Sequence, residues 1–314
     1  MRIPWQKNSS LKNACLGIEL NHGQVWAVLR TDRGVIESYI PESDEQGFDG
    51  LAVWLEEKNL GNLPTVVCLD VREYELHLVE SPQVPVNELS AALSFRIAEF
   101  TGESANNKVL QAFPLPADAY RGRVTMSYAA ITDRRYLQRI VDFCINQNLR
   151  LERMLINELS TLNVLSYIDP QSCIGVLRFE ANSGVIYLYR EGALYCTRQI
   201  PLGIDDLGLN QVLPEEGELS LQTSSRLDVL ALEIQRSMDY FESQIGVGSV
   251  SELWLMKPDQ IDISAVLGEL EEQLNTPVRL LSLESIFNRQ ESTKPLTASL
   301  VMALGGALSY ELAG

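Results

Sequence analysis

Histidine is scarce in this sequence of 314 residues, and its cysteines are not paired. Only His22 and His77 are present, and the five cysteines lie far apart with no C-x-x-C spacing among them. Histidine and cysteine supply most zinc ligands and most nucleophile–base pairs. Their scarcity and spacing argue against a metal centre, a redox dithiol and catalysis that uses a histidine base. The cysteines are predicted to be reduced and mostly buried thiols.

Basic residues are also few, because 25 lysines and arginines face 42 aspartates and glutamates, which gives a formal net charge of −17. Such a field repels phosphate backbones and anionic lipid headgroups, so nucleic acid is not expected as a partner. It favours a basic peptide instead, and cytoplasmic segments beside membrane helices are enriched in Lys and Arg. An acidic protein is therefore expected to reach a membrane through such a tail.

Long apolar runs are the third absence. Residues 1–13 carry Arg2, Lys7 and Lys12 without an apolar run after them, so a secretory signal is not expected. The uncharged stretch 295–310 includes polar residues and glycines and falls short of the roughly 20 apolar residues that span a bilayer. It is predicted to be a buried helix, and the chain is expected to stay in the cytosol without inserting into a membrane.

A repeated pattern is the strongest feature that is present. The sequence CLGI begins at Cys15 and CIGV begins at Cys173, and a glycine follows at the same spacing, from 15 to 34 and from 173 to 192. Both stretches are rich in β-branched and aromatic residues, so each predicts a three-stranded meander with glycine closing a tight turn. The alternative is two unrelated meanders that share this spacing by chance.

Strands and helices alternate in the rest of the chain, which predicts an α/β architecture. Strands are predicted at 65–69, 124–131, 252–255 and 278–281. Apolar stripes predict helices through Leu89, Leu93, Ile97 and Phe100, through 137–145 with Thr132 or Asp133 as the cap, and at 263–274. A surface loop is predicted at 203–223, followed by a long helix that begins at a capping pair of Ser225 and Asp228.

The order of these elements resembles the actin-like (ribonuclease H-like) fold, and particular segments resemble the PilM/MshI family. In the second half these segments are TRQIPLG at 197–203, LEIQRS at 232–237 and ALGGA at 303–307. In the first half, ESP at 80–82, AAI at 129–131 and LRLE at 149–152 resemble the family's inserted subdomain. The likeness covers nearly the whole chain, and it rests on the order of the segments because none is specific alone.

The resemblance implies a two-lobe α/β fold with a subdomain inserted in the first lobe. The implied divisions are the start of the first lobe at 1–79, the inserted α/β subdomain at 80–154, a connecting helix of the first lobe at 155–171 and the second lobe at 172–314.

The resemblance also implies a role. The short basic start and the lack of a membrane helix resemble the MshI variety, which serves the mannose-sensitive haemagglutinin (MSHA) pilus, whereas related GspL proteins continue into a membrane helix. A non-enzymatic cytoplasmic scaffold is expected, held at the inner membrane by the cytoplasmic tail of a PilN-like protein. The assembly ATPase or platform proteins would be further partners. The segment 79–93 is the expected groove, with Val79, Val84, Val86 and Leu89 as candidate contacts.

Nucleotide-binding positions can be carried over from the resemblance, and they depart from the pattern of actin-like ATPases. Those enzymes hold phosphate on two Asp-x-Gly turns and magnesium beside them. The first turn falls on Glu19, Asn21, His22 and Gly23, the second on Arg178 and Glu180, and the adenosine contact on Met256 and Lys257. Glu180 beside a triphosphate costs about 4 kcal/mol per close charge pair at intermediate dielectric. Glu19 and Glu180 are expected to be solvated turn residues.

Alternatives remain open. Arg178 or Lys257 would bind phosphate as a cation, or Asn182, Ser183 and Gly184 would form a shifted amide cradle. An active actin-like ATPase or small-molecule kinase would then need ATP and magnesium, and a filament-forming protein is the third class. With the turns as they stand, neither a cofactor nor a metal ion is expected.

Overall fold

The computed structural model describes residues 13–31, 34–42, 47–102, 107–169, 171–210, 218–282, 286 and 296–311. The chain divides into two compact units. The first unit consists of Met1–Tyr74, Asp133–Asn163 and Met302–Gly314. The second unit consists of Glu75–Thr132 and Val164–Val301.

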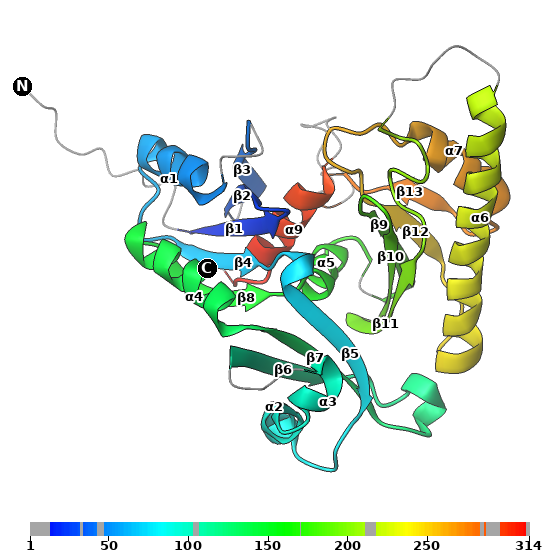
Figure 1. Ribbon diagram of the computed structural model, residues 1–314, viewed down its shortest axis with the longest axis horizontal. Coiled ribbons are helices and arrows are strands. Elements are labelled where there is room, and N and C mark those ends of the chain that lie inside the picture. The colour runs from blue at the N-terminus through cyan, green and yellow to red at the C-terminus, as the bar shows by residue number, and fades with distance from the viewer. Residues whose placement is uncertain are drawn as a thin grey trace, which may run out of the picture. The chain divides into compact units, whose positions relative to one another are not determined.

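The first unit is built on a five-stranded sheet in the order β3-β2-β1-β4-β8 (Figure 1). Its strands are β1 (Ala14–Asn21), β2 (Gln24–Thr31), β3 (Gly34–Tyr39), β4 (Pro64–Cys68) and β8 (Arg150–Leu155). The first three form the predicted antiparallel meander, while β4 pairs in parallel with both β1 and β8. The helices are α1 (Gly47–Lys58), α4 (Arg134–Asn146), α5 (Asn157–Leu165) and most of α9 (Ala298–Leu308).

The second unit repeats this plan and adds a small sheet. Its five-stranded sheet has the order β11-β10-β9-β12-β13. The strands are β9 (Cys173–Phe179), β10 (Gly184–Arg190), β11 (Ala193–Ile200), β12 (Glu252–Leu255) and β13 (Val278–Leu280), with helices α6 (Glu218–Tyr240) and α7 (Ser264–Gln273). β9 to β11 form the second predicted meander, and β12 pairs in parallel with β9 as β4 does with β1. The two halves therefore have the same topology.

The remaining part of the second unit, residues 75–132, is named here the small subdomain. Its three-stranded sheet has the order β5-β7-β6, with β5 (Tyr74–Glu80), β6 (Lys108–Pro114) and β7 (Met126–Asp133). Helices α2 (Leu89–Ser94) and α3 (Ile97–Thr101) accompany it, and α2 packs against β6. Residues 134–154, which the sequence prediction placed in the inserted subdomain, form α4 and most of β8 in the first unit, because β8 pairs with β4.

Close backbone packing in the first unit depends on glycine. A Cβ atom added at Gly17 of β1 would lie 1.8 Å from the carbonyl oxygen of Ala303 in α9, and one added at Gly305 would lie 2.1 Å from the carbonyl oxygen of Ser160. Helix α9 can therefore approach the sheet and α5 only where these side chains are missing. The segment of α9 from Val301 to Leu304 is fully buried, as predicted for this apolar stretch.

Several local predictions are wrong. The stripe from Leu89 to Phe100 is divided between α2 and α3 by a turn at Phe95 and Arg96, and Phe95 is 89% exposed. Helix α6 begins at Glu218, inside the predicted loop, so Ser225 and Asp228 lie within the helix and do not cap it. Ile145 faces solvent although it fits the apolar stripe of α4. The cap of α4 is confirmed, because Asp133 accepts a hydrogen bond from the amide of Arg135 at 2.7 Å.

The cysteines are all free thiols, and Cys15, Cys68, Cys144 and Cys196 are buried. Burial raises the pKa of Cys15 to about 12 and the pKa values of Cys144 and Cys196 to about 11. A thiol-specific reagent at pH 8 should therefore modify the half-buried Cys173 first in the native protein. Burial also raises the pKa of Cys173, but this thiol is the more accessible one, whereas a pKa of about 11 at Cys144 and Cys196 leaves about a hundredfold less thiolate than an unshifted thiol has. Equal reaction rates for all five thiols in the folded protein would contradict this expectation.

No helix within the described ranges is both long enough and apolar enough to cross a bilayer.

Candidate functional site

The first hairpin turn joins β1 to β2 through His22 and Gly23. Both residues have positive φ, 54° and 80°, and Asn21 pairs with Gln24 across the turn, as in a two-residue type I′ hairpin. The amide of His22 donates a hydrogen bond to Oδ2 of Asp70 at 2.8 Å. A carboxylate of the protein itself therefore occupies an amide that would face a phosphate in an actin-like ATPase.

Asp70 is held as an anion at this turn. It follows β4 and is 4% exposed, and Arg72 binds it through Nε at 3.2 Å and through a terminal guanidinium nitrogen at 2.9 Å. Burial would raise the pKa of Asp70, but hydrogen bonds and the charge from Arg72, together with the amide of His22, hold this pKa below its usual value. The negative charge at the first turn is thus permanent near neutral pH.

Glu19 is not the solvated turn residue that the sequence suggested. It lies within β1, paired with Trp26 of β2 and Cys68 of β4, and it is 0% exposed. The strand continues two residues beyond it, to Asn21, so Glu19 lies within the sheet and not in the turn. Nearby, the hydroxyl of Tyr136 accepts a hydrogen bond from the amide of Asp70 at 2.9 Å. Burial raises the pKa of Tyr136, and the negative charges of Asp70, Glu73 and Glu19 raise it further.

A second buried carboxylate, Glu158, lies at the start of α5. The hydroxyl of Tyr74 donates to Oε2 of Glu158 at 2.8 Å and accepts from the amide of Asn157 at 3.2 Å. Sequence reasoning missed both Glu158 and Asp70. The available signal was position, since each carboxylate lies within three residues of the end of a strand in the parallel part of the sheet, where α/β folds place their sites. Within the described ranges, no group of three or more His, Cys, Asp or Glu residues has the spacing of a metal site.

The second hairpin turn, between β9 and β10, carries its own ion pair. Arg178 is 1% exposed, and its Nε lies 2.9 Å from Oε1 of Glu180, whose side chain is 16% exposed. Glu180 is therefore a largely buried partner of Arg178 and not a solvated residue, which corrects the prediction. The charge reversal at this turn is balanced internally, so the guanidinium of Arg178 is already engaged by a carboxylate.

The predicted amide cradle at Asn182, Ser183 and Gly184 is packed against the loop after β11. The amide of Glu180 donates to the carbonyl of Ser183 at 2.8 Å, and the amide of Asp205 donates to the carbonyl of Ala181 at 2.8 Å. Asn182 donates through its side chain to Oδ2 of Asp205 at 3.2 Å. A phosphate approaching this turn would meet the carboxylates of Glu180 and Asp205, which repel it.

The lack of a side chain at Gly203 allows the loop after β11 to approach the turn between β9 and β10 closely. A Cβ atom added at Gly203 would lie 2.3 Å from the amide nitrogen of Ser183, and the amide of Gly203 donates to Oδ2 of Asp206 at 2.9 Å. The backbone of the loop thus covers part of the surface on which a nucleotide phosphate would rest.

Met256 and Lys257, the third predicted contact, follow β12. Met256 is fully buried, and its amide donates to the carbonyl of Leu177 at 2.9 Å. Lys257 forms an isolated parallel bridge with Thr297. The structure therefore brings Met256 next to the β9 strand that bears Arg178, while its side chain belongs to the core of the second unit.

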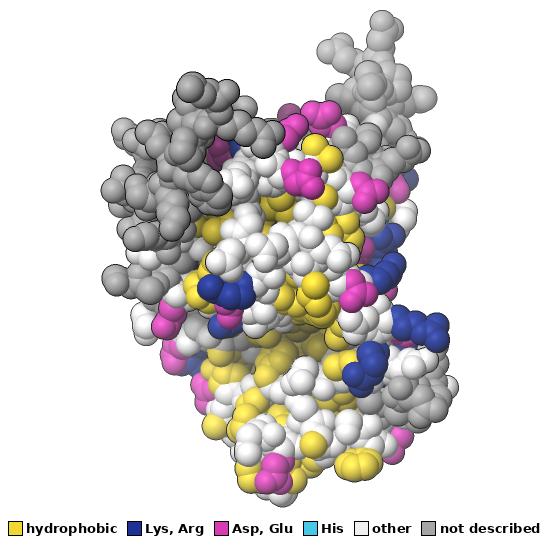
Figure 2. Space-filling view, turned by 90° about the vertical axis from the view of Figure 1, so that its left-hand side faces the viewer, with side chains coloured by type: hydrophobic (Ala, Val, Ile, Leu, Met, Phe, Trp, Pro, Cys, Tyr) yellow, Lys and Arg dark blue, Asp and Glu magenta, His cyan; other side chains and the backbone are white. Residues whose placement is uncertain are grey.

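The small subdomain has a pocket of ≈ 220 Å³ at the expected groove. Three of the four candidate partner contacts, Val84, Val86 and Leu89, line it. The fourth, Val79, is 8% exposed and packs in the core cluster with Leu89. Val86 is 66% exposed, and the hydroxyls of Ser81 and Ser127 lie 2.6 Å apart at the pocket wall. In Figure 2 this subdomain forms the bottom of the view, where hydrophobic side chains gather in patches between polar ones.

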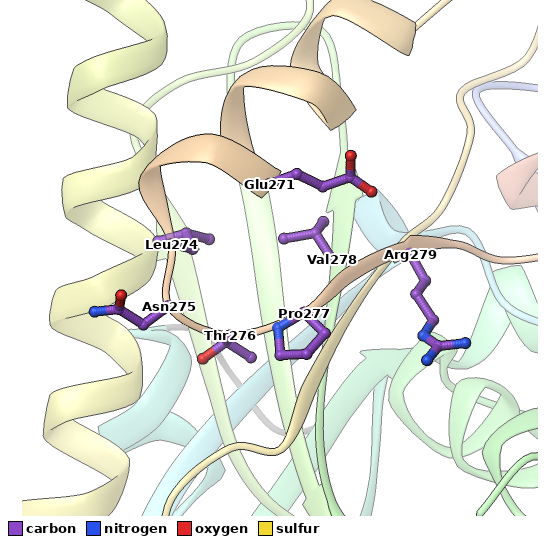
Figure 3. A pocket seen from close by; sticks show the side chains of 7 residues that line it. All are labelled: Glu271, Leu274, Asn275, Thr276, Pro277, Val278 and Arg279. Atoms are coloured by element: carbon purple, nitrogen blue, oxygen red, sulfur yellow. The ribbon is translucent and has the colours of Figure 1, made fainter.

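A further pocket of ≈ 500 Å³ lies at the end of α7, beside β13. Figure 3 shows that Glu271 comes from the last turn of the helix and Arg279 from the strand, and that Pro277 lies on the segment that leads into the strand. Arg279 forms an ion pair with Glu252, which does not line the pocket: one of its guanidinium nitrogens lies 3.2 Å from Oε1 of Glu252. None of the residues selected from the sequence lies in this pocket.

No protein-family model and no curated protein sequence matches the chain. Solved structures do match. A chain of the PilM–PilN type IV pilus biogenesis complex superposes with a TM-score of 0.68 at 16% identity, covering 94% of this chain and 98% of that one. A protein of unknown function with an actin-like ATPase fold from Bacteroides thetaiotaomicron gives 0.51 at 10% identity, over 88% and 94% of the two chains.

The cytoplasmic domain of EpsL, an inner-membrane component of the type II secretion system of Vibrio cholerae, gives a TM-score of 0.50 at 14% identity, over 95% and 96% of the two chains. The fold is therefore actin-like, as the order of elements predicted.

Proposed function

We propose that this protein is a non-enzymatic scaffold of a type IV pilus assembly platform of the MSHA-like kind. It works in the cytoplasm at the inner membrane, where it binds the cytoplasmic tail of a PilN-like membrane protein. The assembly ATPase or platform proteins of the same machine are its further partners. The actin-like fold serves here as a rigid support for a peptide, and ATP hydrolysis plays no part.

The fold comparisons support the place of the protein in such a machine. The PilM–PilN complex has a chain of the same architecture over nearly the full length of both chains. EpsL, whose cytoplasmic domain also has this architecture, is an inner-membrane component of a secretion system. An acidic chain with a formal charge of −17 suits a partner with a basic tail.

The proposal that the protein is not an enzyme rests on one observation: carboxylates of the protein itself occupy both hairpin turns. At the first turn Asp70 accepts a hydrogen bond from the amide of His22, and at the second turn Glu180 forms an ion pair with the guanidinium of Arg178. An actin-like ATPase holds phosphate on free turn amides, and Arg178 could replace them here only as a free cation. Binding of ATP would require breaking the partly buried hydrogen bond between His22 and Asp70 and the largely buried ion pair of Arg178 and Glu180, and separating such an ion pair is costly in a poorly solvated site.

The pocket of the small subdomain supports the proposed binding of the tail peptide. Val86 stands exposed at its rim and Val84 and Leu89 supply apolar walls, which suits one apolar side chain of an extended tail. The edge strand β5 runs directly into this segment, so main-chain pairing along the strand would add to the contact.

Titration of a fluorescent peptide from the tail of the PilN-like protein of the same system tests this site. Val86→Glu should weaken binding at least about tenfold, because a carboxylate would face the apolar contact. Val229→Glu on α6 is the matched control, since Val229 is also exposed, at 45%, and lies outside the pocket. Equal affinities for the wild type and both variants would remove the small subdomain from the proposal.

A further inference from the structure

The loop between β6 and β7, residues 115–125, is named here the anchor loop. It connects directly to the pocket of the small subdomain, because Pro114 before it and Thr125 at its end line that pocket. The amide of Ser81, which also lines the pocket, donates to the carbonyl of Thr125 at 2.9 Å. A displacement of the anchor loop therefore displaces part of the pocket wall.

Asp118 fixes the anchor loop to the five-stranded sheet of the second unit. The hydroxyl of Tyr195 donates to Oδ1 of Asp118 at 2.8 Å, and a guanidinium nitrogen of Arg190 lies 3.1 Å from Oδ2. Arg190 ends β10 and Tyr195 lies in β11. One carboxylate of the loop is thus bound, through both of its oxygens, to two adjacent strands of the sheet.

The turn η5 (Ala119–Gly122) of the anchor loop packs against η6 (Phe241–Ile245), the π-helical turn that continues α6 at its lower end in Figure 1. A guanidinium nitrogen of Arg121 donates to the carbonyl of Ser243 at 3.0 Å. A Cβ atom added at Gly246 would lie 2.6 Å from Cγ of Arg121. The stem of this arginine therefore lies where only glycine leaves room for it.

The backbone of this turn is left-handed over three residues. Tyr120 has φ 54° and Arg121 has φ 57°, and Gly122 follows with φ 65°. Two successive non-glycine residues in this region cost free energy, and they persist only where surrounding contacts hold them. Burial and a hydrogen bond with Tyr240 raise the pKa of Tyr120 above its usual value. Loss of the contacts with the second sheet is therefore expected to release the turn.

A separate contact attaches the small subdomain at β7. The amide of Thr197 donates to the hydroxyl of Tyr128 at 3.1 Å, and Tyr128 is buried. Thr197 lies in β11, which is the edge strand of its sheet, so this bond satisfies an amide at the sheet edge. Release of the anchor loop would leave this attachment in place and would affect the loop and the pocket wall.

We propose that the anchor loop positions the tail pocket: its contacts with the second sheet, through Asp118 and Arg121, hold Pro114 and Thr125 where the tail peptide meets them. A pocket with a mobile wall has to be ordered on binding, which lowers its affinity. Because such coupling is reciprocal, a bound peptide strengthens the docking of the loop. The inference rests on the proposed tail-binding function, and it gives a positioning role to residues that do not line the pocket.

Two substitutions outside the small subdomain remove the contacts of Asp118. Tyr195→Phe deletes only the hydroxyl, and Arg190→Gln deletes the cation. In the full chain, the double variant should exchange the amides of residues 115–125 for deuterium at least about fivefold faster and bind the tail peptide at least about fivefold more weakly.

Arg236→Gln is the control for the double variant. It also removes a cation from the second unit, but the partner of Arg236 is Glu233 of its own helix, 2.6 Å away. Exchange at residues 115–125 and affinity for the tail peptide should both equal those of the wild type. Exchange in β9 should be the same in all proteins, and if it rises in the double variant, Tyr195→Phe alone is used, because it keeps the buried ring.

Reciprocity gives a result that a purely structural role of the loop would not produce. Saturating tail peptide should slow exchange at residues 115–125 at least about twofold in the wild type. The same peptide concentration should have no such effect on Val86→Glu, whose pocket is impaired while its anchor loop is unchanged.

The outcomes separate this inference from the proposed function. A wild type that binds no tail peptide would contradict the proposed function, and the inference would fall with it. Equal affinities of the wild type and the double variant, with faster loop exchange in the variant, would overturn the positioning role alone. Unchanged loop exchange in the double variant would show that Asp118 does not anchor the loop.

Discussion

Replacement of Arg178 by methionine is expected to lower the free energy of unfolding by about 3 kcal/mol, because it leaves the largely buried carboxylate of Glu180 without its cation. Methionine keeps much of the length of the arginine stem, so loss of volume contributes little. Urea unfolding of the wild type and the variant measures the difference.

The double variant Arg178→Met with Glu180→Leu is the control for this prediction. It removes both charges, and apolar replacement of a buried ion pair is often close to neutral. The expected loss is therefore below about 1 kcal/mol. If the double variant is as unstable as the single one, the ion pair at the second turn is not what stabilises this region.

Substitution of Gly17 by alanine should be at least as damaging. The added methyl group would meet the carbonyl oxygen of Ala303 at 1.8 Å, and backbone atoms of α9 cannot move aside as a side chain can. Overpacking of this kind costs about 3 kcal/mol or more when the backbone must shift. Thermal unfolding should show a large fall in Tm for Gly17→Ala, and a similar fall for Gly305→Ala.

Gly268→Ala in helix α7 is the control for both substitutions. No atom lies within 4 Å of a Cβ added at Gly268, and this glycine is inside α7. Alanine is favoured over glycine in a helix by about 1 kcal/mol, so this variant should be neutral or slightly more stable. A Tm for Gly17→Ala that equals the Tm for Gly268→Ala would contradict the packing of α9 on β1.

The elements that the sequence predicted well are those set by local patterns. The two meanders and the cap at Asp133 follow from alternation, turn chemistry and a single side chain, all of which are visible along the chain. The equal spacing of Gly34 and Gly192 nevertheless suggested the same role in both turns, and this is wrong. Gly192 is the second residue of its turn, whereas Gly34 already pairs with Thr31 as the first residue of β3. The glycines at equal spacing thus occupy different positions in the two turns.

The features that the sequence missed depend on contacts between distant segments. Glu19 looked like a turn residue because nothing near it in the sequence shows that β4 pairs alongside. Asp70 was overlooked because its partner His22 is 48 positions away. The pairing of Arg178 with Glu180 is local, but their burial is not visible along the chain, so Glu180 was predicted to be solvated and Arg178 was considered as a cation for phosphate.

Calorimetry on one preparation tests the central claim most directly, with the tail peptide of the PilN-like protein in one titration and ATP with magnesium in the other. The account predicts saturable heat from the peptide and none from ATP at millimolar concentration, since Asp70 and Glu180 already occupy the two turns. Saturable ATP binding without peptide binding would contradict it and would make the protein a nucleotide-using member of the actin-like fold.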